Sequence, residues 1–407
     1  MTQSPRSVKA PRIRQEKVPL PRDIKVMLAA AFLIALGFGL VAPVLPQFAT
    51  TFDVGATAAA VIVSIFAFMR LVFAPAGGAL IGRFGERNVY VCGLLIVAVS
   101  TAACAFAQDY WQLVIFRGLG GAGSVMFTVA AMGLLIRLAP PERRGRVSGA
   151  YASAFLIGSV LGPVAGGLLA GFGLRVPFLA YAGALLVAAV VVRTMLSGNG
   201  SVSQETGHAP AMALGEALAD SAYRAAVFSS FGNGWVTFGV RMATIPLFAV
   251  AVLDSRPETA AWALAVFAVG NALALTFSGR LADARGRKFL LIPGLVITGV
   301  ATGLIGLTTD LTAFLVASAV AGFGSGLLGP AQQAAVADVI GRGRSGGKVL
   351  AVFQMAADTG AIIGPVVAGL MADHWGYGWA FAITGCVLLL AAAGWLAARE
   401  PLGARVS

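Results

Sequence analysis

The feature that most constrains this chain is a run of about 20 mostly apolar residues that recurs along its length. Wound as a helix, a run of that length crosses a hydrocarbon layer about 30 Å thick. Backbone polar groups in lipid must bond within their own segment, so each run predicts a transmembrane helix. We place twelve of them, at residues 26–46, 57–80, 88–107, 110–137, 147–170, 175–195, 224–250, 260–281, 289–308, 311–339, 348–371 and 377–398.

Composition agrees with an all-α membrane protein, because 58% of the residues are hydrophobic, 11% are charged and the mean hydropathy is +0.87. The three cysteines stand in apolar runs and the two histidines stand far apart, so we expect no disulfide, metal site or cofactor. The formal net charge of +12 would suit a nucleic-acid partner, but the placement of the basic residues favours a membrane instead.

Basic residues gather in the N-terminal tail and in the even-numbered loops, whereas the odd-numbered loops carry mainly acids. By the positive-inside rule, this bias predicts both termini in the cytoplasm of a bacterial cell, below its cytoplasmic membrane. We expect a disordered basic tail over residues 1–25, a helical bundle over 26–196, a linker with a short interfacial helix over 197–222, a second bundle over 223–398 and a cytoplasmic tail over 399–407.

The two halves of the chain repeat one another. The matching landmarks are Pro46 with Pro246, Gly78 with Gly279, and Gly162-Pro163 with Gly364-Pro365, at offsets of 200, 201 and 202 residues. The sequence therefore predicts two pseudo-symmetric bundles of six helices each. Duplications of this kind place a binding site where the halves meet, near the middle of the membrane, and let one half rock against the other.

The fifth run carries glycine at every fourth position, at Gly158, Gly162 and Gly166. On a helix this spacing forms a flat stripe that a second helix can approach closely. Pro163 removes a backbone donor in the middle of the stripe and bends the helix. Close packing alone explains the pattern, and a conformational role is the alternative.

The loops that follow the second and the eighth predicted span carry two copies of one motif. The second-half loop, GRLADARGRK, resembles the G-x-L-A-D-R-x-G-R-K motif of the major facilitator superfamily through Gly279, Asp283, Gly286, Arg287 and Lys288. The first-half copy keeps five positions of this motif, but Gly82 stands where the acid is expected and Glu86 where a base is expected. The retained positions of the first copy are Gly78, Leu80, Arg83, Gly85 and Arg87.

The fourth and fifth runs extend the resemblance over essentially the whole chain after the tail. Arg117 matches the arginine of the family's R-x-x-Q-G motif, with Gly120 in place of glutamine. The stretch Gly149–Gly167 is similar to the antiporter motif G-x8-G-x3-G-P-x2-G-G. The resemblance implies the major facilitator fold of a twelve-span drug:proton antiporter, and efflux rather than uptake.

Few charges lie deep in the predicted spans, where a charge costs several kcal/mol. They are Arg70, Arg117, Arg241 and Asp358. Asp358 is the one deep carboxylate of the sequence, so we assign it, with Arg117, to proton coupling. A structural ion pair with an arginine is the alternative for Asp358, and helix-fixing contacts are the alternative for each arginine.

Aromatic, methionine and amide side chains of the spans are candidates to line a central cavity. With the arginines, the set is Arg70, Arg241, Phe38, Met126, Tyr151, Phe155, Asn233, Trp235, Phe238, Asn271, Gln332, Gln333, Gln354 and Met355. Ordinary packing between helices is the alternative explanation for each of them.

These observations predict a monomeric exporter in the lipid bilayer that exchanges protons for amphiphilic small molecules by alternating access. An exporter of one anionic or zwitterionic metabolite is the second hypothesis, because three deep arginines face one aspartate. A membrane enzyme is disfavoured, since the sequence has no Walker loop, nucleophile elbow or His-Glu-x-x-His motif. A channel or receptor is disfavoured by the repeat and by the glycine-rich bent helices.

Overall fold

The computed structural model describes residues 21–138, 144–196, 212–253, 257–341, 344 and 346–401, and every regular element within them is a helix. The N-terminal half contains α1 (Arg22–Val41), α2 (Leu45–Thr50), α3 (Ala56–Phe84), α4 (Glu86–Ala105), α5 (Tyr110–Leu138), α6 (Arg144–Ala170) and α7 (Val176–Met195). The C-terminal half contains α8 (Leu214–Ala219), α9 (Ser221–Asn233), the π-helix η2 (Gly234–Val240), α10 (Arg241–Ala251), α11 (Pro257–Arg285), α12 (Lys288–Ile305), α13 (Leu311–Ile340), α14 (Gly347–Trp375) and α15 (Tyr377–Ala397).

Twelve helical segments among the described residues are long and apolar enough to span a membrane, which confirms the predicted number. Two of them differ from the expected straight runs. The first helix stops at Val41 and resumes as α2, because Pro43 lies in the intervening turn and has no N–H to continue the hydrogen-bond ladder. The seventh span is composite, since η2 interrupts it between α9 and α10.

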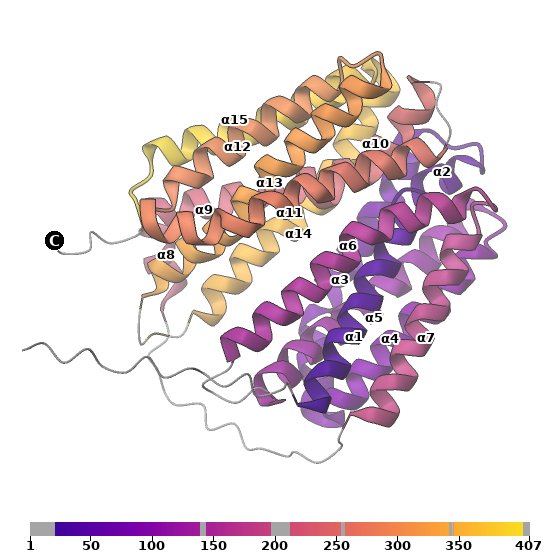
Figure 1. The fold of residues 1–407 in the computed structure, drawn as a ribbon, viewed down its shortest axis with the longest axis horizontal. Helices are drawn as coiled ribbons and strands as arrows, with labels where there is room; N and C mark the ends of the chain where they lie inside the picture. The colour runs from indigo at the N-terminus through magenta and orange to yellow at the C-terminus, as the bar shows by residue number, and fades with distance from the viewer. Residues whose placement is uncertain are drawn as a thin grey trace, which may run out of the picture.

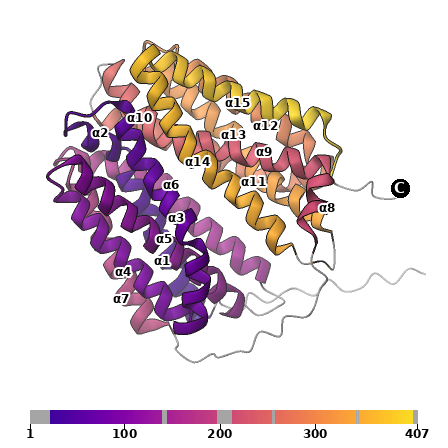
Figure 2. The ribbon, with the colours of Figure 1, turned by 180° about the vertical axis from the view of Figure 1, so that it is seen from behind.

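The helices form two bundles, each with its own apolar core (Figures 1 and 2). In the N-terminal bundle, α1–α7, the core includes Tyr90, Phe178 and Leu185. In the C-terminal bundle, α8–α15, it includes Phe314 and Trp395. The predicted fold class, two six-span bundles of one plan, is confirmed.

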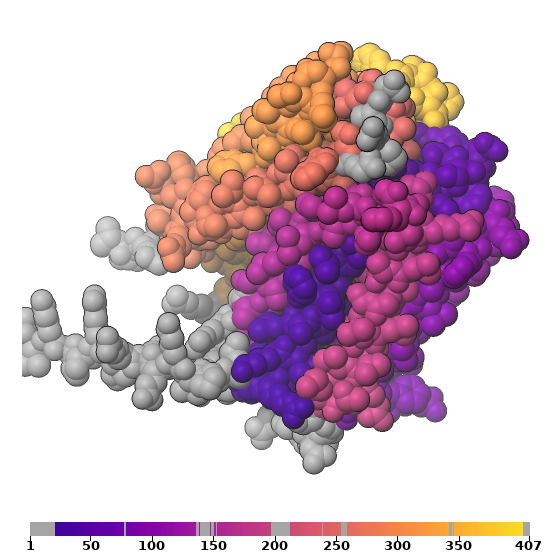
Figure 3. All heavy atoms as spheres, turned by 45° about the vertical axis from the view of Figure 1, so that its right-hand side comes forward, coloured from indigo at the N-terminus to yellow at the C-terminus, as the bar shows by residue number. Residues whose placement is uncertain are grey.

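The long axes of the bundles are inclined, so that the bundles converge near α2 and α10 and diverge toward α8 (Figures 1 and 2). We call these the α2 end and the α8 end of the molecule. The bundles touch mainly along two helix pairs, α3 with α14 and α6 with α11, and α10 also contacts α2 and α3. In the space-filling view the coral surface of α11 lies on the magenta surface of α6 (Figure 3).

Contact between α3 and α14 is closest at the α2 end. There the Ser64 hydroxyl of α3 donates to the carbonyl of Ile362 across 2.7 Å. Farther along α3, Phe68 and Val72 are 45% and 52% exposed, and on α14 the side chains of Gln354 and Met355 are exposed. The parts of α3 and α14 that lie toward the α8 end of the molecule therefore have surface that the other bundle does not cover.

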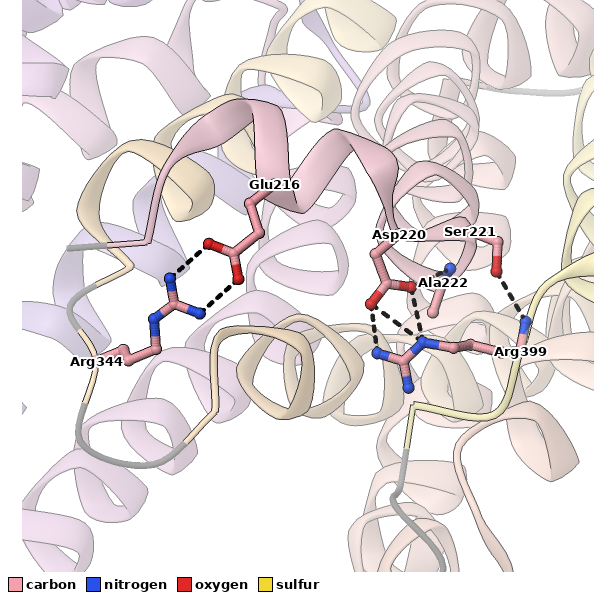
Figure 4. Close-up of polar contacts among 6 residues, drawn as sticks. All are labelled: Glu216, Asp220, Ser221, Ala222, Arg344 and Arg399. Atoms are coloured by element: carbon pink, nitrogen blue, oxygen red, sulfur yellow. Dashed lines mark hydrogen bonds and ion pairs between the residues drawn. The ribbon is translucent and has the colours of Figure 1, made fainter. Parts of the chain in front are cut away.

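Ion pairs fix α8 to the C-terminal bundle (Figure 4). Glu216 accepts two hydrogen bonds from the guanidinium of Arg344, at 2.7 and 2.6 Å. Asp220 accepts from the backbone N–H of Ala222 at 2.9 Å, which caps α9, and also pairs with Arg399. The chain thus breaks at Asp220 instead of running as one interfacial helix into the seventh span.

Several expectations fall on parts of the chain outside the described residues. These parts are residues 1–20 of the predicted tail, 197–211 of the predicted linker and 402–407 at the C-terminus. The side chain of Phe238 and the surroundings of Gly78 are likewise outside the described set, although both residues belong to helices.

Candidate functional site

Asp358 of α14 lies within electrostatic range of Arg70 of α3, so the deep carboxylate of one bundle feels a guanidinium of the other, although no ion pair within 4 Å joins these two described residues. The side-chain amide of Gln354, one helical turn before Asp358, lies next to its carboxylate. Arg70 is held from its own bundle, because its Nη1 donates to the hydroxyl of Ser124 on α5 at 2.7 Å. The other two deep charges predicted from the sequence are Arg117 and Arg241, and each makes its contacts within its own bundle.

Arg117 lies inside the N-terminal bundle and is 7% exposed. Its guanidinium carbon sits 4.2 Å from the ring centroid of Phe66, a cation–π geometry. Its Nε is buried and has no hydrogen-bond partner among the described residues. It interacts electrostatically with Cys104 and Tyr181, whereas the interaction of Asp358 is with Arg70. The proton-coupling role predicted for Arg117 is therefore not supported by a direct contact with Asp358.

Arg241 lies inside the C-terminal bundle instead of between the bundles. Its guanidinium carbon is 3.7 Å from the ring centroid of Phe267, and its Nε donates to the carbonyl of Thr237 at 3.2 Å. It borders a cavity of about 10 Å³ with side chains of α11, α12, α13 and α15. The sequence predicted Arg241 in a cavity between the halves, and the observed position is different. The reason is that Arg241 directly follows η2, whose wider turn changes the direction in which later side chains point.

Most of the predicted cavity amides and aromatics have partners inside one bundle. Gln332 donates to Ser229 at 3.1 Å, Trp235 to Thr384 at 3.3 Å, and Asn233 accepts from Thr237 at 2.9 Å. The others that pack within a bundle are Phe38, 6.1 Å from Phe66 between ring centroids, Met126 and Tyr151 against the N-terminal core, and Asn271, whose carbonyl lies against Gly326. Buried amides need partners, and these find them locally.

The exposed members of the predicted cavity set form a different group. Gln333 and Gln354 are exposed, Met355 is 48% exposed and Phe155 is 43% exposed. Gln354 and Met355 stand on the part of α14 that leads to Asp358. They are the candidates that remain available to a ligand at the boundary between the bundles.

The glycine stripe packs directly on α1. A Cβ at Gly158 would lie 2.6 Å from the carbonyl oxygen of Phe32, and one at Gly162 would lie 2.6 Å from that of Leu36. The second half repeats this contact, where a Cβ at Gly364 would lie 2.9 Å from the Cα of Trp235. Gly166 packs in the same way on Leu40, next to the bend at Pro163, and Pro365 packs on Gly239. The stripe is a close helix contact, and its conformational role stays a prediction.

The second-half motif builds a polar cluster at the α8 end, which we call the Arg287 cluster (Asp283, Arg287, Lys288, Asp338 and Glu400). Arg287 donates to Asp283 at 2.5 Å and to Asp338 at 2.8 Å, and its backbone N–H donates to Glu400 at 2.8 Å. Burial works to lower the pKa of Arg287, but the hydrogen bonds to Asp338 and Asp283 outweigh it and raise this pKa above its usual range. Lys288 Nζ donates to the carbonyl of Ala398 at 2.7 Å, so the cluster joins the ends of α11, α13 and α15.

The first-half motif has different contacts among the described residues. Arg87 donates to the carbonyl of Arg193, and its Nε is buried without a partner among the described residues. Gly82, in the place of the acid, has open space around it, and the neighbouring Arg83 stacks on Phe84 at 5.4 Å. Both motifs keep one glycine for a conformational reason, since Gly85 and Gly286 have φ of +76° and +98°.

Sequence reasoning missed one residue that joins the bundles. Asp373, which lies just beyond the predicted span 348–371, belongs to the end of α14 and accepts hydrogen bonds from the first turn of α3. The available signal was Gly55, which precedes α3 and has no side chain with which to cap it.

The chain is similar to known membrane proteins. The family model described as Major Facilitator Superfamily matches residues 27–254 and 226–407. Multidrug resistance protein 2 of Bacillus subtilis is 25% identical over 363 residues, which cover 86% of this chain and 88% of that protein. Quinolone resistance protein NorA of Staphylococcus aureus is 29% identical over 186 residues, 46% of this chain and 48% of that protein.

A solved structure shares the fold. The crystal structure of a bacterial homologue of the human lysosomal transporter Spinster, in an inward-facing and unoccupied conformation, superposes with a TM-score of 0.78. The sequences are 18% identical, and the match covers 93% of this chain and 97% of that one.

Proposed function

The chain belongs to the Major Facilitator Superfamily of transporters, and from that premise we propose that it exports amphiphilic small molecules in exchange for protons. The named relatives, a multidrug resistance protein and a quinolone resistance protein, support the direction and the breadth of the substrate class. The observation that carries the proposal is that Asp358, an ionisable acid of one bundle, lies within electrostatic range of Arg70, a base of the other.

Protonation of Asp358 is the proposed coupling step. An ionised Asp358 is favoured by Arg70, and a protonated Asp358 is favoured wherever the carboxyl is desolvated away from that cation. A proton on Asp358 therefore weakens the attraction between α14 and α3. Because the two states of the pair differ in their affinity for a proton, proton binding shifts the equilibrium between arrangements of the bundles.

Substrate would bind between the bundles near Asp358, where Gln354 and Met355 are exposed on α14, and the exposed Phe155 of α6 is a further candidate. Methionine and phenylalanine adapt to apolar ligands of different shapes, which suits a broad substrate range. We place the α8 end in the cytoplasm, since basic residues gather in its loops. In this assignment both termini are cytoplasmic, and the space between the diverging bundles opens toward the cytoplasm. We also propose that the protein works as a monomer in the bilayer.

Transport by purified protein in proteoliposomes tests the coupling. With an imposed proton gradient, Asp358→Asn should abolish uphill accumulation of a cationic amphiphilic dye, while counterflow of that dye without a gradient should persist. Asp310→Asn is the matched control, because Asp310 caps α13 within its own bundle. Uphill accumulation by Asp358→Asn at the rate of the unmodified protein would remove Asp358 from the mechanism.

A second substrate class is supported by Arg117. Its buried Nε has no hydrogen-bond partner, and no ion pair joins its side chain to an acid in the described part of the chain. A carboxylate of an anionic or zwitterionic metabolite would satisfy such a group. Counterflow assays with a cationic dye and an organic anion distinguish the two classes, since Arg117→Gln should impair only the transport of the anion.

A further inference from the structure

We propose that Asp373 holds the bundles together at the α2 end by capping α3 from the opposite half. Its Oδ1 accepts from the backbone N–H of Ala56 at 2.9 Å, and its Oδ2 accepts from that of Thr57 at 2.9 Å. Oδ2 also accepts from the Thr57 hydroxyl at 2.5 Å. These donors and the carboxylate are more than 300 positions apart in the chain and belong to different bundles.

The first turn of α3 needs this carboxylate. The N–H groups that begin a helix have no partner within the helix, and an anion there is also stabilised by the helix dipole. The residue at the N-cap of α3 is Gly55, which makes no side-chain bond. Elsewhere at the same end of the molecule the cap is local, since Asp310 accepts from Ala313 at 2.9 Å and Asp109 accepts from Gln112 at 2.9 Å.

The fit around Asp373 requires close backbone approach. A Cβ at Gly55 would lie 3.1 Å from Oδ2 of Asp373, and a Cβ at Gly369, one turn earlier on α14, would lie 2.7 Å from the Cα of Thr57. The bond from Ser64 to the carbonyl of Ile362 continues the contact along the same helix pair. Separating the bundles at this end therefore uncaps α3 and breaks the Ser64 bond together.

Only one of the two helix pairs carries this device. At the repeat offset of 202 residues, the position of Asp373 corresponds to Gly171, which follows α6 and has no side chain to offer. We infer that the α3–α14 pair, not the α6–α11 pair, sets the cost of opening the α2 end. This inference needs neither a substrate nor a coupling ion, so it stands apart from the proposed proton exchange.

Thiol labelling measures the opening directly. A variant without Cys92, Cys104 and Cys386 would carry Ser64→Cys as reporter, and an impermeant maleimide would be added from the side of the α2 end. Adding Asp373→Ala should raise the labelling rate about tenfold, because three hydrogen bonds to a charged group are lost. Asp310→Ala, which removes a cap within one bundle, should leave the rate unchanged. Equal rates for the two aspartate variants, both folded, would overturn the proposal.

A milder pair of substitutions decides the matter if Asp373→Ala does not fold. Thr57→Val removes the one side-chain bond to Asp373 and should raise the labelling rate about threefold. Thr51→Val is its control, since the Thr51 hydroxyl bonds only to the carbonyl of Phe48 in its own bundle. A labelling rate for Thr57→Val no higher than for Thr51→Val would also overturn the proposal.

Discussion

The two bundles share a packing skeleton but differ in their charges. At matching repeat positions, a Cβ at Gly39 would lie 2.8 Å from Cδ of Pro163, and one at Gly239 would lie 2.7 Å from Cδ of Pro365. Phe66 and its repeat equivalent Phe267, 201 positions later, each carry a guanidinium over the ring. The arginines come from different helices, however, since Arg117 belongs to α5 and Arg241 to α10.

The difference is greatest at the α8 end. In the C-terminal bundle the Arg287 cluster ties three helix ends together, and Glu216 and Asp220 add ion pairs with Arg344 and Arg399. At the repeat positions of Asp283 and Arg287, the N-terminal bundle has Gly82 and Glu86. Backbone contacts between helices are thus common to both halves, whereas the ion pairs described at this end belong to the C-terminal half. The comparison of the two bundles indicates that helix packing fixes the fold, whereas the charged residues can vary between the two copies.

The largest expected effect tests the shared skeleton. Gly162→Leu and Gly364→Leu should each destabilise the protein by about 3 kcal/mol, because the new side chain would overlap backbone atoms that cannot move aside. Apparent melting temperature in detergent is the measurement. Gly183→Leu is the control, since Gly183 has no atom within 4 Å of an added Cβ. Loss of stability in one half alone would show that the skeleton is not equivalent in the two copies.

The second effect tests the difference in charge. Arg287→Ala should cost about 2 kcal/mol, since Arg287 is 7% exposed and its loss leaves the 27% exposed Asp338 without its cation. Arg87→Ala should cost less than about 1 kcal/mol, because among the described residues Arg87 makes one hydrogen bond, to a carbonyl, and leaves its Nε without a partner. The same melting assay compares the two variants. Equal losses would mean that the N-terminal bundle has an ionic cluster of similar strength.

The sequence predicts the skeleton well, because its signals are local. Apolar runs give the spans, and recurring glycine and proline at Gly162-Pro163 and Gly364-Pro365 give the repeat and the close helix contacts. The partner of Asp358 was not predictable in this way. Choosing Arg70 over Arg117 requires knowing which helix faces α14, and no spacing within one span contains that information.

Two further features lie beyond local patterns. Arg241 follows η2, where an extra residue in the turn redirects later side chains into the C-terminal bundle. Asp373 caps a helix of the other bundle, so its role depends on how the bundles dock and not on its neighbours in the chain. Positions such as these, where the two halves meet or a helix changes its winding, are where sequence periodicity stops being informative.

The smallest effect concerns the ion pairs that fix α8 to the C-terminal bundle. The hydrogen bonds from Arg344 lower the pKa of Glu216 below its ordinary value of 4.5. Burial works to raise the pKa of Asp220, but the hydrogen bonds from Arg399 and from the N–H of Ala222 lower it below 3.8. A carboxylate whose folded-state pKa is depressed stabilises the fold above its unfolded-state pKa and loses that contribution as pH falls through the folded value.

The attachment of α8 should therefore be constant at neutral pH and weaken only below about pH 4.5. A spin label at Ala213, before α8, should report faster motion as pH falls through this range. Arg344→Gln should give faster motion already at pH 7, whereas Arg285→Gln, whose guanidinium stacks on Phe289 and leaves the Glu216 pair intact, should not. Because exposed ion pairs contribute little, the melting temperature should hardly change in either variant. Motion of the label that does not depend on pH would mean that packing of α8, and not its ion pairs, attaches it to the C-terminal bundle.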